Sequence, residues 1–206
     1  MKIPIALLLS LAFTVLPQTA PQQHPPHSAR EYARALNDPA RDGWQKPDEV
    51  IAALALKPGE VIADIGSGPG YFAKRFAKHA GKVYAVDIDE ELLKMAKQGA
   101  PANLETVLAA PDDPRLPEGS VDTIFFCNSL HHIQNRAAYY AKLAKALKPG
   151  GRIVDVDFQK KPLPVGPPER MKLSESEVTE ELKAAGFHRT RSFDFLPYQY
   201  FLVFER

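Results

Sequence analysis

The chain has 206 residues, a formal net charge of +1, 45% hydrophobic residues and a single cysteine. This length suits one α/β domain, and the near-neutral charge lacks the basic footprint of a nucleic-acid-binding protein. A lone cysteine, Cys127, excludes an intrachain disulfide and a multi-cysteine metal site. We therefore expect neither a nucleic-acid partner nor a metal.

The N-terminal part of the chain differs in composition from the rest. Residues 3–16 form an apolar run behind Lys2, shorter than the roughly 20 residues of a membrane-spanning helix, and residues 17–28 are rich in Pro, Gln and His. This pattern predicts a signal peptide or membrane anchor at 1–20 and a Pro/Gln-rich linker at 21–30. We expect an exported protein, periplasmic or secreted; a membrane-anchored or cytoplasmic protein is the alternative, and membrane contact is expected only through residues 3–16.

Residues 31–206 show the alternating pattern of an α/β domain. Helices are expected at 31–36, 48–56, 71–79, after Asp89, at 137–147, and from a capping box at 174 to 185. Strands are expected at 61–65, 82–87, 104–108, 121–127 and 152–158, followed by a hairpin of 187–195 and 198–204. Five strands that alternate with helices predict a parallel sheet covered on both faces.

A glycine-rich loop follows the first predicted strand and reads Asp64-Ile-Gly66-Ser-Gly68-Pro-Gly70. Glycine allows a sharp turn and lets a ligand approach the backbone closely. A strand, such a loop and a helix N-terminus together predict a site for part of a nucleotide or amino-acid-like ligand. The dinucleotide fingerprint would need glycine where the chain has Tyr71, which disfavours a nicotinamide-dependent oxidoreductase.

Acidic residues stand at the ends of the next two strands. Asp87 ends the second strand, and because Asp89 suits the cap of the following helix, we expect Asp87 to be free for ribose hydroxyls. In the loop after the third strand, an adenine could pack on Ala110 or Pro111 and donate its amino hydrogens to Asp112. Asp113 could take that role instead, and a pure turn function fits the loop equally well.

Taken in order, these motifs resemble those of class I S-adenosylmethionine (SAM) dependent methyltransferases. Besides the glycine loop and Asp87, the matching segments are 116–122, the Leu-His-His-Ile segment 130–133, and Leu-Lys-Pro-Gly-Gly-Arg at 147–152. The resemblance spans about residues 45–206. It implies a Rossmann-like doubly wound α/β fold, with a mostly parallel seven-stranded sheet and a C-terminal antiparallel hairpin. The chain is similar to ubiquinone/menaquinone-type and arsenite-type small-molecule methyltransferases, although the arsenite type needs several thiols.

The resemblance implies that SAM is the cofactor. The glycine loop would hold its methionine end, Asp87 its ribose, and Ile88 would lie beside its adenine. The full set of candidate cofactor-binding residues is Asp64, Gly66, Ser67, Gly68, Gly70, Asp87, Ile88, Pro111, Asp112 and Asn128.

His131 and His132 are the candidate acid/base residues. Histidine titrates near neutrality, so either could take a proton from a methyl acceptor. We expect adjacent side chains to point in different directions, so that at most one faces the acceptor. A packing role for both is equally consistent with the sequence.

The expected function is methyl transfer from SAM to a small-molecule or lipid-like acceptor. A protein side-chain methyltransferase and a non-catalytic SAM- or nucleotide-binding module are the alternatives. The signature of amino-methylating enzymes is missing at 128–131, which reads Asn-Ser-Leu-His. Segments 31–47 and 159–172 are expected to form the acceptor pocket, with Trp44 covering the core rather than contacting a ligand. No feature of the sequence specifies an oligomeric state.

Overall fold

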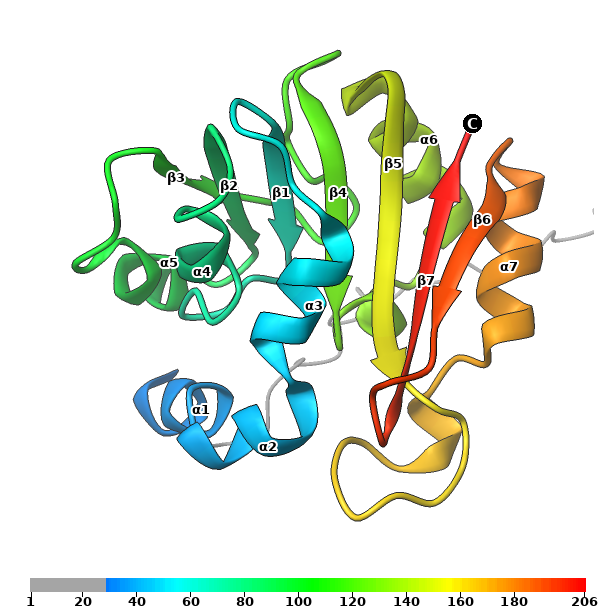
Figure 1. The fold of residues 1–206 in the computed structure, drawn as a ribbon, viewed down its shortest axis with the longest axis horizontal. Helices are drawn as coiled ribbons and strands as arrows, with labels where there is room; N and C mark the ends of the chain where they lie inside the picture. The colour runs from blue at the N-terminus through cyan, green and yellow to red at the C-terminus, as the bar shows by residue number, and fades with distance from the viewer. Residues whose placement is uncertain (1–28) are drawn as a thin grey trace, which may run out of the picture.

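A seven-stranded sheet forms the centre of the computed structural model, which describes residues 29–206 (Figure 1). Its strand order is β3-β2-β1-β4-β5-β7-β6. Strands β1 to β5 pair in parallel, and β7 lies antiparallel between β5 and β6. The predicted fold class is confirmed. The strands are β1 (Val61–Ile65), β2 (Lys82–Asp87), β3 (Leu104–Leu108), β4 (Val121–Cys127), β5 (Leu147–Phe158), β6 (His188–Phe193) and β7 (Gln199–Glu205).

Helices cover both faces of this sheet. On one face the helix residue Phe76 packs edge-on against Phe125 of β4, and on the other Tyr140 and Leu182 join Phe126 in a second apolar cluster. Successive side chains of β4 therefore enter opposite cores, which explains the continuous apolar run at its residues 124–127. The helices are α1 (Ala29–Leu36), α2 (Asp42–Gln45), α3 (Pro47–Leu54), α4 (Ala73–Phe76), α5 (Glu90–Lys97), α6 (Arg136–Ala146) and α7 (Glu175–Ala184).

Two helix starts are set by local side-chain caps, as the sequence indicates. The Ser174 hydroxyl accepts the Glu177 amide of α7 and the Glu177 carboxylate accepts the Ser174 amide, which completes the capping box. Asp89 caps α5 by accepting the amides of Glu91 and Leu92.

Several predicted boundaries are wrong, and β6 ends at Phe193 rather than at 195. Helix α4 covers Ala73–Phe76 rather than 71–79, because the bonds after it are of the tighter i to i−3 type. Helix α3 stops at Leu54 because Ala55 adopts a left-handed φ of 48°. Residues 148–151, expected to separate the helix ending at 147 from the strand beginning at 152, belong to β5. The pairing of β5 with β4 is irregular there, so the turn residues fit within the strand.

The N-terminal predictions fall mostly beyond the described residues. The leader at 1–20 and most of the linker lie outside them, while α1 begins at Ala29, within the last two linker positions. Within residues 29–206, no helix combines the length and apolar character needed to cross a bilayer.

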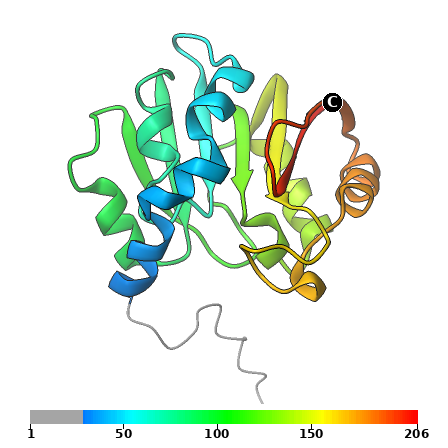
Figure 2. The ribbon, with the colours of Figure 1, turned by 60° about the horizontal axis from the view of Figure 1, so that its bottom comes forward.

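The strand order creates a crevice at the carboxyl edge of the sheet. The chain runs from β1 toward β2 and β3 on one side, and β4 and β5 follow on the other side. The loops after β1 and β4 therefore diverge, and ligands bind at such a switch point in open α/β sheets. Figure 2 shows α1, α2 and α3 running in succession across the front of the sheet. Residues 29–46, called the N-terminal cover below, lie at the carboxyl ends of β1 and β4 (Figure 1).

Candidate functional site

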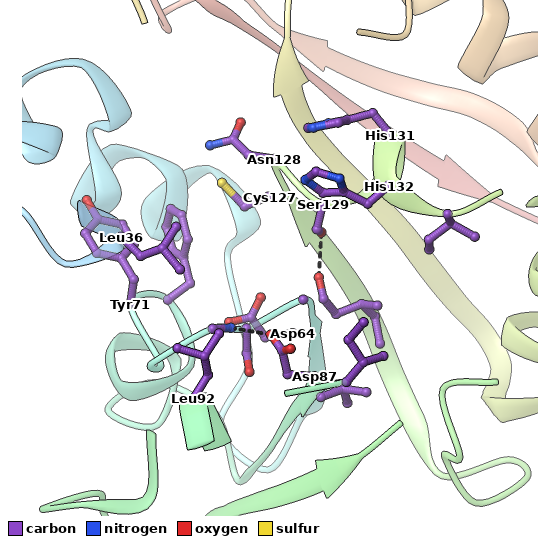
Figure 3. Close-up of a pocket in the computed structure, with 18 of the residues that line it drawn as sticks. Leu36, Asp64, Tyr71, Asp87, Leu92, Cys127, Asn128, Ser129, His131 and His132 are labelled. Atoms are coloured by element: carbon purple, nitrogen blue, oxygen red, sulfur yellow. Dashed lines mark hydrogen bonds between the residues drawn. The ribbon is translucent and has the colours of Figure 1, made fainter. Parts of the chain in front are cut away.

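A cavity of about 430 Å³ occupies this crevice (Figure 3). Its wall combines the glycine loop after β1, the end of β2, the loop after β3, the turn after β4 and the N-terminal cover. Leu36 and Tyr71 lie on one side in Figure 3, and His131 and His132 lie on the opposite side. One cavity therefore brings together segments that are widely separated in sequence.

The glycine loop is packed too tightly for side chains at two positions. Gly66 has φ +74°, and a Cβ there would lie 2.5 Å from the Cβ of Ser129. Gly68 has φ +54°, and a Cβ there would lie 3.0 Å from Leu36 of the N-terminal cover. The Ser129 hydroxyl donates to the carbonyl of Ile65 at 2.6 Å, which ties the turn after β4 to the end of β1. Glycine is required at 66 for both its conformation and its size, and at 68 for its conformation.

Asp87 connects the glycine loop to the end of β2. Its carboxylate accepts the Gly68 amide at 2.8 Å through one oxygen and the Asp89 amide at 3.0 Å through the other. Asp87 is therefore engaged locally, contrary to the expectation that it would be free. A carboxylate has about four lone-pair positions, so both oxygens can still accept ribose hydroxyls. Burial raises the pKa of Asp87 above its usual range.

Asp64 is a buried carboxylate in the cavity wall, with 3% of its surface exposed. Burial raises its pKa to about 7. The Arg41 guanidinium and the Ala73 amide oppose this rise, and the Asp87 charge adds to it. A cationic ligand group in contact with Asp64 would favour the ionised carboxylate.

Asn128 belongs to a closed ring of three side-chain amides. Its Nδ2 donates to Gln45 at 3.3 Å, Gln45 donates to Gln199 at 2.9 Å, and Gln199 donates back to Asn128 at 2.6 Å. Gln45 and Gln199 are 0% and 1% exposed. Arg41 also donates to Gln45 Oε1, at 3.0 Å. The ring joins the N-terminal cover, the turn after β4 and strand β7, and the two glutamines have no local sequence signal.

His131 forms a buried pair with Asp157, the penultimate residue of β5. Its Nδ1 lies 2.8 and 3.0 Å from the two carboxylate oxygens, and the side chains are 2% and 1% exposed. In the neutral imidazole the Nδ1 hydrogen donates to the carboxylate, which leaves Nε2 as a proton acceptor. The His132 ring lies 4.2 Å from the His131 ring and also lines the cavity. The expectation that the two rings diverge is wrong, because the short 3-10 helix Leu130–His132 brings them together.

Comparison with known proteins identifies the family. Residues 63–155 match the family model described as Methyltransferase domain. A ubiquinone/menaquinone biosynthesis C-methyltransferase of Cupriavidus metallidurans is 30% identical over 147 residues, which cover 66% of this chain and 60% of the relative. A SAM-dependent methyltransferase structure from Aquifex aeolicus has a TM-score of 0.79 and 27% identity, and covers 85% of this chain and 97% of that one. The chain belongs to the class I SAM-dependent methyltransferases.

Phosphoethanolamine N-methyltransferase 1 of Arabidopsis thaliana is a more partial match. It is 27% identical over 152 residues, which cover 70% of this chain and 28% of the relative. The methyltransferase chain thus spans less than two thirds of the length of both curated relatives.

SAM is the cofactor of this methyltransferase, and the residues present fit it. Gly66 and Gly68 line the cavity with backbone alone, and Asp87 offers acceptors for ribose hydroxyls. Asp64 can face a cationic group of SAM. The Ser67 hydroxyl is buried and has no hydrogen-bond partner among the described residues, as expected of a group that meets a ligand.

Two of the predicted cofactor-binding residues lie away from the cavity. The Asp112 side chain is 79% exposed and lies 3.5 Å from the Lys142 ammonium. Gly70 packs on α5, where an added Cβ would lie 3.2 Å from Ala96. The other eight predicted cofactor residues line the cavity, as do both histidines.

Trp44 lines the cavity, contrary to the expectation of a purely covering role. Its ring centroid lies 5.7 Å from that of Phe158. Arg41 and Asp157 were also missed. Arg41 lies in a turn without a recognisable motif, whereas Asp157 could have been found because the ends of adjacent parallel strands meet at one edge.

Proposed function

We propose that this methyltransferase acts on an uncharged small-molecule or lipid-like acceptor that gives up a proton, with His131 as the general base. The observation that supports this proposal most directly is the buried pair of His131, which lines the cavity, with Asp157. SAM supplies a methyl group already activated by a sulfonium charge. The protein has to align the acceptor, exclude water and receive the proton.

His131 is oriented for that last task. Asp157 accepts the Nδ1 hydrogen of His131, which fixes the ring and leaves Nε2 to take the acceptor proton. The imidazolium that forms is then paired with the Asp157 carboxylate. Such an orienting carboxylate is the usual partner of a histidine base.

The cavity wall favours an acceptor without a phosphate. Arg41 is the sole lysine or arginine among the described lining residues, and its guanidinium already donates to the Leu36 carbonyl and to Gln45. A phosphate needs unengaged cationic donors. Near the histidines the wall offers Trp44, Phe158 and other apolar groups, which suit a flat or lipid-like molecule.

The test is product formation with a panel of acceptors. The full chain is incubated with methyl-labelled SAM and either uncharged phenols, enols and lipid-like alcohols or phosphorylated amines, and methylated products are identified by mass spectrometry. We expect label in the uncharged group only. Asp157→Asn should lower kcat by about 100-fold or more, because misorienting a general base forfeits most of its 10²- to 10⁴-fold contribution. Asp194→Asn, the same change on an exposed loop, is the matched control.

Two results would contradict the proposal. Transfer to phosphorylated amines alone would show that the cavity recognises anions. Failure of the folded chain to bind SAM would contradict the proposed catalytic function and leave only the fold assignment.

A further inference from the structure

A second carboxylate lies behind the His131–Asp157 pair. Asp155 and Asp157 are two residues apart on β5, so their side chains lie on the same face of the sheet, toward α6 and α7. Both are 0% exposed. Tyr200 of β7 lies opposite Asp157 in the antiparallel register and is 3% exposed. Two acids and a phenol are thus enclosed in an apolar layer.

Hydrogen bonding distinguishes the two acids sharply. The Asp157 carboxylate binds His131 Nδ1 and accepts the Phe158 amide at 2.7 Å. Within residues 29–206, neither carboxylate oxygen of Asp155 nor the Tyr200 hydroxyl has a hydrogen bond of acceptable geometry, although all three atoms are buried. A buried carboxylate without donors is strongly disfavoured in its charged form.

The neighbouring elements supply no cation in contact with Asp155. From α6, Arg136 directs its Nε and Nη2 to the two carboxylate oxygens of Glu181 of α7, both at 2.6 Å. Tyr140, also of α6, donates to the same Glu181 at 3.2 Å. Arg136 favours the Asp155 carboxylate only through its more distant charge. The groups that face Asp155 are therefore Asp157 with its partner His131, the phenols of Tyr140 and Tyr200, and the Arg136–Glu181 ion pair.

We propose that Asp155 is a neutral carboxylic acid at neutral pH and a positioning residue that keeps His131 able to accept a proton. Its role as stated rests on the proposed function of His131. With Asp155 neutral, Asp157 is the single negative charge behind the imidazole. An ionised Asp155 would add a second negative charge, which would stabilise the imidazolium and leave His131 already protonated before the acceptor arrives.

The electrostatics of the cluster agree with this assignment. Burial raises the pKa of Asp155 well above its usual range, and the Asp157 charge raises it further. Tyr200 lies near enough to favour the Asp155 carboxylate, without offsetting the burial. Among the described residues, no group of three His, Cys, Asp or Glu side chains is arranged to hold a metal ion. A proton on Asp155 is therefore the simplest way to remove its charge.

Infrared spectroscopy of the full chain without SAM tests the proton directly. Asp64, whose pKa is about 7, is also partly protonated at pH 7, so the spectra are compared in an Asp64→Asn background. There the chain should still show the C=O stretching band of a protonated carboxylic acid, which should be lost when Asp155→Asn is added and kept when the exposed control Asp194→Asn is added. Absence of the band from the folded Asp64→Asn chain would overturn the proposal.

The nitrogen chemical shifts of the His131 ring at pH 7, followed by NMR and assigned with His131→Gln, test its consequence. In Asp155→Asn these shifts should match those of the wild type, because one neutral group replaces another. In Asp157→Asn they should change, because the hydrogen bond from Nδ1 to the carboxylate is lost. A change in Asp155→Asn as large as that in Asp157→Asn would show that Asp155 is charged, and a stoichiometric metal ion lost in Asp155→Asn would also refute the proposal.

These readouts separate the inference from the proposed function, because none of them needs an acceptor or turnover. If the band and the His131 ring shifts behave as expected but no acceptor is methylated, Asp155 is neutral and the catalytic role of His131 is wrong. If methylation occurs and Asp155→Asn lowers kcat at pH 7 as much as Asp157→Asn does, the role assigned to Asp155 is wrong.

Discussion

The ionisation of Asp64 should couple SAM binding to pH. Burial raises the pKa of this carboxyl from its usual 3.8 to about 7 in the protein without ligand. Three pH units correspond to about 4 kcal/mol, and this near-complete burial leaves little solvent screening. Protonated Asp64 makes its full contribution to the free energy of unfolding below pH 4. This contribution is lost as the pH rises to 7 and the buried carboxyl ionises. We therefore expect Asp64→Asn to be more stable than the wild type at pH 8, by at most about 4 kcal/mol.

SAM binding should reverse this preference. A cationic group of SAM beside Asp64 favours the carboxylate, so binding below pH 7 must first release the Asp64 proton. For one linked proton with a pKa of about 7, affinity should rise by about 16-fold between pH 5.5 and pH 7. Burial also raises the pKa of Asp87, which contributes in the same direction. Asp64→Asn should bind more weakly at pH 7 and lose most of the pH dependence.

Calorimetric titration across this pH range measures both effects. Repeating it in buffers with different ionisation enthalpies counts the protons released on binding, and Asp194→Asn serves as the exposed control. A pH-independent affinity in the wild type would refute the reasoning. So would an Asp64→Asn variant that keeps the full pH dependence, since another group would then carry the linked proton.

Three further predictions concern the cavity wall. Asp87→Ala should weaken SAM binding by about 10- to 100-fold in calorimetry, because it removes the ribose acceptor and leaves the Gly68 amide without its partner. Gly66→Ala should lower the free energy of unfolding by at least about 1 to 3 kcal/mol in urea titrations, because its positive φ and the clash with Ser129 add. Gly43→Ala, at a position with open space around it, should leave the free energy of unfolding unchanged. An equal loss of this free energy in both variants would show that the clash at Gly66 is relieved. Cys127 should resist thiol reagents until the protein unfolds, because burial raises the pKa of its thiol to about 12, and rapid labelling of the native state would contradict this.

The chain sequence determined the elements that depend on near neighbours. Strands β1 to β4 have their predicted bounds because each is a short segment rich in β-branched, aromatic and other apolar residues between turn residues. The capping box at Ser174 and the cap at Asp89 link residues at most three positions apart. The positions of the glycine loop and Asp87 could also be predicted locally, because both lie in one βαβ unit of two strands and the helix between them.

Only the tertiary structure decided which side chains meet across the site. His131 is hydrogen-bonded to Asp157, 26 residues away in the sequence, and Gln45 is hydrogen-bonded to Gln199, 154 residues away. Trp44 and Arg41 enter the cavity because the N-terminal cover folds over the carboxyl ends of the strands. Such contacts depend on strand order, register and helix packing together. The local sequence pattern determines the secondary structure that each segment favours. The partner of a buried polar group depends instead on how all the segments pack together.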